Sequence, residues 1–211
     1  MDKYIETFET WNEIANLYQE KFMDFSLYNE TYDFFCDSLP ISSKILDLGC
    51  GPGNITKFLS NKRNDFEIEG TDISVNMINL AKLNNPSLKF FVSDIRKFNV
   101  QKIKYNGIIS GFCLPYLSLS DIRNLIPKLH NSLKKNGILY ISFVQGNPDD
   151  SGIKIGKDGR KLYFFYHDIN EIKNLLVDSK FRSEKFYSIE YQNNDNSFDT
   201  HIIIISKKLN I

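Results

Sequence analysis

The segment Lys44 to Asn54, KILDLGCGPGN, constrains the fold more than any other part of the sequence. It begins with a short apolar run, which is typical of a parallel strand covered on both faces. Gly49, Gly51 and Gly53 follow at once, and glycine tolerates positive φ and lets backbone amides come close to a ligand. Helical spacing begins directly after them. The sequence therefore predicts a strand, a glycine loop and a helix, the first half of a βαβ unit that holds a cofactor.

The glycine spacing separates two kinds of cofactor loop. Dinucleotide loops have G-x-G-x-x-G, whereas this loop has G-x-G-x-G, with Asp47 two positions before the first glycine. This D-x-G-x-G-x-G string resembles motif I of the class I S-adenosylmethionine-dependent methyltransferases, of the small-molecule type. Further landmarks of that family follow in order, at Thr71 to Ser74, Ser93 to Ile95 and Tyr105 to Gly111. The resemblance covers residues 44–144 well and the remainder loosely.

The resemblance implies an α/β fold with a Rossmann-like sheet. We expect seven mostly parallel strands with an antiparallel last strand, in three α/β/α layers, and one domain over residues 1–211. Within it, 1–40 would form an N-terminal helical cap, 41–144 the cofactor-binding core and 145–211 a hairpin insertion with the C-terminal strands.

Local signals predict the elements around this core. Aromatic and apolar residues at helical spacing predict one helix over 11–22 and another over 28–39, stopped by Pro40. Ser120 and Asp121 would begin a further helix, with Gly137 as its terminator. Asp158-Gly159 predicts the turn of a β-hairpin between 153–157 and 160–166. Asp168 would cap a helix, and two strands, 181–192 and 201–208, would pair.

Composition excludes several classes of partner. Twenty-six basic residues balance twenty-six acidic ones, so no large positive field favours nucleic acid. No apolar run is long enough to cross a bilayer, and the first residues lack the pattern of a signal peptide. The three cysteines have no metal-ligand spacing. We therefore expect a cytoplasmic protein, a monomer or homodimer, with a small-molecule substrate, no metal, and neither a nucleic-acid nor a membrane partner.

The resemblance implies a set of residues for S-adenosyl-L-methionine. Asp72, at the end of the second strand, would accept hydrogen bonds from the ribose, with Ser74 capping the next helix and leaving Asp72 free. Asp94 would accept the adenine amino group, although an aspartate at a strand end is also ordinary turn chemistry. Tyr18 would approach the methionine part or simply pack in the core. The full predicted cofactor set is Tyr18, Asp47, Gly49, Gly51, Asn54, Asp72, Ile73, Met77, Asp94, Ile95 and Gly111.

The residues that act on the methyl acceptor are harder to predict. Many relatives in the family have a histidine shortly after the fourth strand, and here Pro115 and Tyr116 occupy that place. A tyrosine of ordinary pKa is a poor base at neutral pH. His167, between the hairpin and a helix start, is the second candidate, with capping or surface placement as its alternative. Tyr116 and His167 are the predicted catalytic residues.

Three functions remain open at this point. The first is methyl transfer to a small molecule by in-line displacement, favoured by proximity and desolvation. The second is an NAD(P)-dependent oxidoreductase, which the loop spacing and the missing Tyr-x-x-x-Lys pair disfavour. The third is a module that binds S-adenosylmethionine without turnover. An open, partly apolar cavity lined by Tyr18, Tyr116 or His167 would favour catalysis over the binding module.

Overall fold

The computed structural model describes residues 3–100, 103–156, 158–193 and 195–209. Lys157, the predicted end of a hairpin strand, lies outside this range. The helices are α1 (Lys3–Glu13), α2 (Ala15–Phe22), α3 (Asn29–Asp37), α4 (Asn54–Lys62), α5 (Val75–Asn84), α6 (Leu119–Ser132) and α7 (Ile169–Asp178). The strands are β1 (Lys44–Leu48), β2 (Glu67–Asp72), β3 (Lys89–Val92), β4 (Tyr105–Ser110), β5 (Leu133–Val144), β6 (Gly152–Ile155), β7 (Lys161–Phe164), β8 (Phe181–Gln192) and β9 (Phe198–Lys208). Short 3-10 turns are η1 (Ile95–Lys97), η2 (Leu114–Tyr116) and η3 (Pro148–Asp150).

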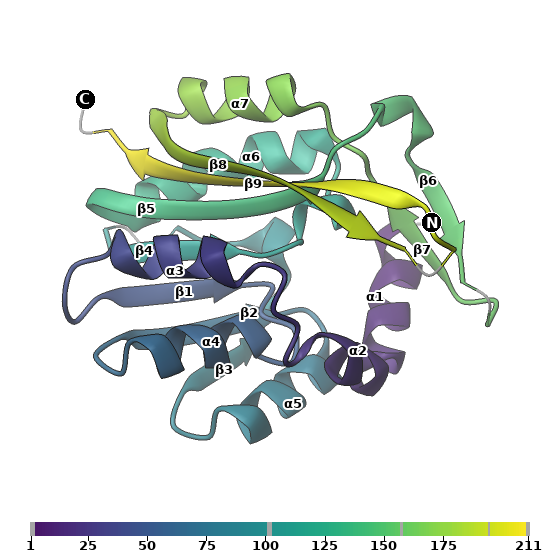
Figure 1. The fold of residues 1–211 in the computed structure, drawn as a ribbon, viewed down its shortest axis with the longest axis horizontal. Coiled ribbons are helices and arrows are strands. Elements are labelled where there is room, and N and C mark those ends of the chain that lie inside the picture. Colours follow the sequence, from purple (N-terminus) through teal and green to yellow (C-terminus); the bar gives the residue numbers. More distant parts are fainter. Residues whose placement is uncertain (1–2, 101–102, 157, 194, 210–211) are drawn as a thin grey trace.

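One sheet of seven strands organises the molecule, in the order β3-β2-β1-β4-β5-β9-β8 (Figure 1). The first five strands in chain order run parallel, and β9 is antiparallel to both β5 and β8. The strand order reverses between β1 and β4, where ligands bind in open α/β sheets. The predicted Rossmann-like sheet, including its antiparallel last strand, is confirmed.

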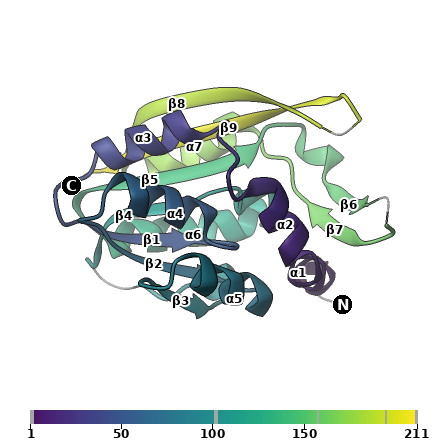
Figure 2. The ribbon, with the colours of Figure 1, turned by 60° about the horizontal axis from the view of Figure 1, so that its bottom comes forward.

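Helices cover both faces of the sheet (Figures 1 and 2). On one face, α6 and α7 pack through Ile122, Leu129 and Ile172 against a core that includes Ile108 and Ile141. On the other face, α3 and α4 contribute a second core, and α5 adds a smaller cluster against Phe90. The central strands β4 and β5 are buried on both sides, which explains their continuous apolar runs.

The helices α1 and α2 and the β6–β7 hairpin lie beyond the carboxyl ends of the parallel strands (Figures 1 and 2). Two threonines of α1 bind the hairpin: the Thr10 hydroxyl donates to the Lys161 carbonyl at 2.6 Å, and the Thr7 hydroxyl accepts from the Tyr163 amide at 2.8 Å. On its other side, Asn12 accepts hydrogen bonds from the Ser74 hydroxyl and the Asn76 amide, at 2.9 and 3.0 Å. These contacts hold α1 between α5 and the hairpin.

Two predicted helices have different ends in the structure. The expected helix over 11–22 belongs to two helices, because Ile14 leaves helical geometry (φ −91°, ψ 14°) where α1 contacts the hairpin and α2 continues along α5. Helix α6 is capped by Ser118, not Ser120: Ser118 and Asp121 form a reciprocal capping box. It ends at Ser132, before Gly137, which lies within β5. The Asp168 cap is confirmed.

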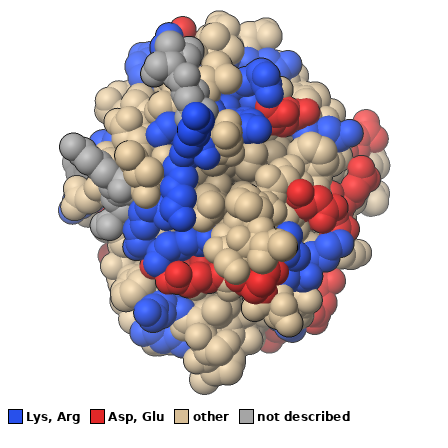
Figure 3. Space-filling model, turned by 90° about the vertical axis from the view of Figure 1, so that its left-hand side faces the viewer, with Lys and Arg blue, Asp and Glu red and all other residues tan. Residues whose placement is uncertain are grey.

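The opposite face of the molecule, at the amino ends of the parallel strands, is charged (Figure 3). Lysine and arginine side chains gather there with acidic neighbours, and at this end Lys44 pairs with Glu67 at 2.5 Å and Lys104 with Glu69 at 2.6 Å. Within the described part of the chain, no helix has the length and apolar character needed to traverse a bilayer.

Candidate functional site

A cavity of about 310 Å³ lies along the carboxyl edge of the sheet, under α1 and α2. It extends from the ends of β3 and β2, past the reversal point between β1 and β4, to β9 and β8. Every strand of the sheet contributes to its wall or is followed by a residue that does: Ser93, Ile73, Gly49, Gly111, Val144, His201 and Tyr191. Apart from Asp47 and His167, all predicted site residues line this cavity.

The glycine loop forms the floor at the middle of the cavity. Gly49, Gly51 and Gly53 all have positive φ, from 53° to 82°, which explains why glycine recurs. A Cβ at Gly51 would point into the cavity, 3.6 Å from the Tyr18 ring, whereas one at Gly49 would lie 2.0 Å from the Cys113 sulfur. The loop therefore leaves free space beside Gly51 that a ligand can use.

Asp72 supports this loop from the end of β2. Its Oδ2 accepts from the Gly51 amide and its Oδ1 from the Ser74 amide, both at 2.9 Å. Ser74 caps α5 as predicted, but Asp72 is not left free by it. The Ile73 amide also interacts with this carboxylate, whose two oxygens together still retain a lone pair for a ligand hydroxyl. Burial raises the pKa of Asp72, since desolvation disfavours its charged form.

Asp47 lies beneath the loop and does not line the cavity, contrary to the expectation of direct contact. It is fully buried, and its Oδ2 accepts a hydrogen bond from the Thr56 hydroxyl at 2.6 Å. Among the described residues, Oδ1 has no hydrogen-bond partner. Burial raises the pKa of Asp47 to about 7, opposed by the Thr56 hydrogen bond and reinforced by Asp72. This carboxylate is thus left with an unpaired buried oxygen next to the loop.

The end of the cavity at β2 and β3 combines apolar surface with one ion pair. Ile73, Met77 and Ile95 line it together with Asp94. The Asp94 carboxylate caps η1 through the Arg96 amide and pairs with the Arg96 guanidinium at 2.8 Å. Asp94 therefore has the turn role that the sequence allowed, and it also lines the cavity, as expected of a residue that binds the cofactor.

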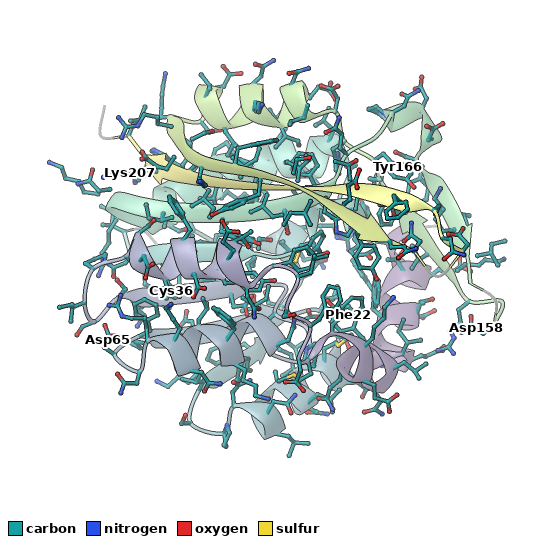
Figure 4. All side chains as sticks on the ribbon, in the orientation of Figure 1. Phe22, Cys36, Asp65, Asp158, Tyr166 and Lys207 are labelled. Atoms are coloured by element: carbon teal, nitrogen blue, oxygen red, sulfur yellow. The ribbon has the colours of Figure 1, made fainter. Side chains whose placement is uncertain are left out.

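The remaining wall is mostly aromatic. Phe22 is turned from α2 toward the interior of the molecule (Figure 4). It belongs to a series of rings whose neighbouring centroids are 4.6 to 6.1 Å apart, which we call the aromatic belt. Its members all line the cavity: Trp11, Tyr18, Phe22, Phe25, Tyr28, Phe112, Tyr116, Phe164 and Tyr191. Such rings supply a dry, flat-walled surface.

The two predicted catalytic residues lie in different places. Tyr116 faces the cavity in contact with Trp11 and Phe164, and burial raises the pKa of its hydroxyl further above neutrality. His167 is only 3% exposed, and its Nε2 lies 2.9 Å from the Leu114 carbonyl, behind η2. We therefore correct the expectation that His167 reaches the pocket: its ring anchors η2 to the segment before α7.

Sequence reasoning missed His201, which does line the cavity. Its Nδ1 lies 2.6 Å from the Tyr28 hydroxyl, and its ring stacks on Tyr191 with centroids 4.7 Å apart at an angle of 11°. The available signal was strand direction. An antiparallel strand begins at the edge where its parallel neighbours end, so His201, paired with Val144, had to lie at the ligand edge.

Known proteins resemble this chain over its central part. A family model described as a methyltransferase domain matches residues 45–137. The trans-aconitate 2-methyltransferase of Variovorax paradoxus (strain S110) is 35% identical over 103 residues, covering 49% of this chain and 39% of that protein. The carboxy-S-adenosyl-L-methionine synthase of Campylobacter concisus (strain 13826) is 31% identical over 108 residues, covering 49% and 45%. The chain thus spans less than half the length of these relatives.

The fold similarity extends over nearly the whole chain. The crystal structure of the 1,6-didemethyltoxoflavin-N1-methyltransferase of Burkholderia thailandensis, with bound 1,6-didemethyltoxoflavin and S-adenosylhomocysteine, superposes with a TM-score of 0.73. The match covers 97% of this chain and 88% of that chain at 13% identity. At this identity the likeness concerns the fold alone.

Proposed function

Because the chain belongs to the class I S-adenosylmethionine-dependent methyltransferase family, we propose that it transfers a methyl group from S-adenosylmethionine to a small molecule bound in the same cavity. The cofactor half of this proposal rests on the glycine loop and its carboxylates. The part of the proposal that concerns the acceptor rests on the cavity space beyond the glycine loop and its carboxylates.

The residues at the loop fit this cofactor. Free space beside Gly51 and the remaining lone pair of Asp72 lie near one another at the end of β1 and β2, and the buried Asp47 carboxylate lies beneath the loop, outside the cavity wall. A cationic ligand with hydroxyl groups would compensate the buried carboxylates, which otherwise lack any basic side chain among the described cavity-lining residues.

The proposed roles follow from this placement. Asp72 would hold the ribose and keep Gly51 in position, Ile73, Met77 and Ile95 would flank the adenine, and Asp94 would face its amino group. Asn54 and Gly111 would border the methionine part, with Tyr18 over it. When bound, S-adenosylmethionine supplies an electrophilic methyl group on a positively charged sulfur.

The protein's own contribution to the reaction is to position the acceptor and to exclude water from it. The aromatic belt excludes water from the place where an acceptor would meet the methyl group, and ring faces attract a cation. Tyr116 keeps its proton at neutral pH, since burial raises its pKa, so it can donate a hydrogen bond but does not serve as a base. The aromatic belt would then orient the acceptor, and orientation can lower the activation free energy by several kcal/mol.

The observation that carries the proposal is the extent of the cavity. It does not end at the glycine loop but continues between Tyr18 and Tyr116 to β8 and β9, which supports turnover over mere storage of the cofactor. The names of the relatives point to small acceptors of different chemistry, a carboxylate in one and a fused heterocycle in another.

A calorimetric titration tests the cofactor. The purified protein is titrated with S-adenosylhomocysteine, NAD and NADP at equal concentrations. We expect micromolar binding of S-adenosylhomocysteine alone. Preferential binding of either nicotinamide cofactor would overturn the proposal, because the loop would then serve a dinucleotide.

A further inference from the structure

The part of the cavity at β5, β9 and β8 contains polar groups that the cofactor does not account for. His201, Asn193 and Asp199 line it between Phe112 and Tyr191. They come from β9 and from the end of β8, on the far side of the glycine loop from Asp72 and Asp94. A ligand that reaches them must therefore extend beyond the cofactor half, toward the acceptor.

The His201 ring is held on several sides. It stacks on Tyr191, contacts the Phe112 ring at 4.8 Å between centroids, and is hydrogen-bonded through Nδ1 to Tyr28. Phe112 has a positive φ of 54°, which is strained for a bulky residue, and its amide donates to the Ser142 hydroxyl at 2.8 Å. Strain of this kind is common where a site must place a ring accurately.

The hydrogen-bond pattern favours one position for the proton on His201. Burial raises the pKa of Tyr28 and lowers that of His201 to about 4, so the phenol and the imidazole are both neutral near pH 7. If the Tyr28 hydroxyl donates to Nδ1, both buried atoms are satisfied and Nε2 keeps the proton. In the reverse arrangement the Tyr28 proton would lack an acceptor among the described residues. The first arrangement leaves an Nε2–H donor on a ring that lines the cavity.

The charges around the cavity restrict what this donor can bind. Asp72, Asp94 and Asp199 are its charged lining residues among those described, and no lysine or arginine lines it. Lys21 lies over the outer rings of Phe22 and Tyr191, at 5.0 and 5.6 Å, without being part of the wall. A carboxylate or phosphate acceptor would thus lose hydration without gaining a cationic side chain of the protein.

We propose that His201, oriented by Tyr28, recognises the methyl acceptor by donating its Nε2–H to an oxygen or ring nitrogen of a flat, uncharged ring. This inference rests on the proposed function, since it assigns the acceptor to the cavity that also takes the cofactor. The belt supplies flat apolar walls, His201 supplies one directional hydrogen bond, and the acidic lining disfavours anions. Tyr28 is a positioning residue in this arrangement, and His201 contacts the substrate.

Histidine-selective ¹⁵N NMR tests the proposal directly, because the chain has three histidines. The labelled protein is first saturated with S-adenosylhomocysteine, and then titrated with 4-quinolone, which is flat and neutral and has a carbonyl acceptor. Two control compounds have rings similar to that of 4-quinolone. Quinoline-4-carboxylate is the anionic control, and indole is the flat control without a hydrogen-bond acceptor. We expect 4-quinolone to shift the Nε2 resonance of His201. It should also bind roughly tenfold more tightly than either control compound.

Two variants separate recognition from structure. His201→Phe keeps a ring against Tyr191 and Phe112 but removes the donor, so the affinity for 4-quinolone should fall roughly tenfold while that for S-adenosylhomocysteine is unchanged. Tyr28→Phe should move the Nδ1 resonance of His201 and populate the other tautomer, a change that loss of packing alone would not produce.

The outcomes distinguish this inference from the proposed function. Failure of S-adenosylhomocysteine to bind would overturn the cofactor assignment. If it binds while 4-quinolone leaves His201 unshifted, or if quinoline-4-carboxylate binds as tightly as 4-quinolone, the acceptor assignment is overturned and the cofactor assignment stands.

Discussion

The two halves of the cavity are built in different ways. The half at β1, β2 and β3 uses backbone amides and carboxylates from short, contiguous segments, with Asp72 hydrogen-bonded directly to the glycine loop. The half at β5, β9 and β8 uses side-chain rings from segments far apart in the chain, such as Tyr28 and His201, which are 173 positions apart. In the proposed function the first half takes the cofactor, and the second half takes the methyl acceptor.

The comparison predicts that changes in one half leave the other half's ligand largely unaffected. It also predicts opposite responses to pH, because the first half contains a carboxyl group whose pKa is raised and the second an imidazole whose pKa is lowered.

The largest effect is expected for Gly51→Val. The new side chain would fill the space beside Tyr18, at a backbone φ of 53° that valine rarely adopts. Affinity for S-adenosylhomocysteine, measured by calorimetry, should fall by roughly 100-fold or more. Gly152→Val is the matched control, since a Cβ at Gly152 meets nothing within 4 Å. Retained affinity in Gly51→Val would show that the loop does not face the cofactor.

Asp72→Ala should weaken the binding of S-adenosylhomocysteine by about 1.5 to 3 kcal/mol, the usual loss when a charge-assisted hydrogen bond is removed. Asp158→Ala, at the tip of the hairpin (Figure 4), is the surface control. Because Asp72 also holds the Gly51 and Ser74 amides, thermal unfolding of the free variant measures the structural share separately. An unchanged dissociation constant would remove Asp72 from the cofactor half.

The acceptor half should gain stability as pH rises. The folded pKa of His201 is lowered to about 4 by burial, opposed by Asp199, and the Tyr28 hydroxyl and the Tyr191 ring are other close neighbours. This contribution is present above the unfolded pKa of about 6.5 and is lost as pH falls toward 4. Between pH 6.5 and 4.5 it amounts to about 2 kcal/mol of unfolding free energy. Urea unfolding of His201→Phe should lack this part of the pH dependence, and an identical profile would place a charged His201 in the fold.

The cofactor half should lose stability as pH rises. The folded pKa of Asp47 is raised to about 7, so its contribution is fully present below the unfolded pKa and is lost as pH rises through 7. From pH 6 to pH 8 the unfolding free energy of the free protein should fall by about 1 kcal/mol through this group. Asp47→Asn should flatten that interval while retaining an acceptor for Thr56. A variant as pH-dependent as the wild type would show that Asp47 is already ionised at pH 6.

Most residues predicted for the cofactor line the cavity, and the sequence could place them there because their determinants are local. The strand, the glycine spacing and Asp47 occupy one short segment, and a helix cap such as Ser74 acts within a single turn. Apolar runs mark β1, β4 and β5, and alternation marks β2, so these strands were predictable from local patterns.

The acceptor half could not be predicted in the same way. His167 was chosen for its place between a hairpin and a helix, but sequence position does not give ring direction, and the ring turned to the Leu114 carbonyl. The break at Ile14 lies where α1, which contacts the hairpin and α5, is followed by α2, and the helical spacing of the sequence does not mark it. Placing His201 at the cavity requires the direction of β9 and the contact with Tyr28. No local sequence pattern gives either of them.

The attachment of α1 on both sides has a kinetic consequence. Its hydrogen bonds to Lys161 and Tyr163 secure it at the acceptor side, and those of Asn12 secure it at the cofactor side. A fluctuation that detaches α1 therefore uncovers both compartments in one event. If cofactor and acceptor bind as proposed, the residence times of these two chemically unrelated ligands are tied to the opening rate of a single helix.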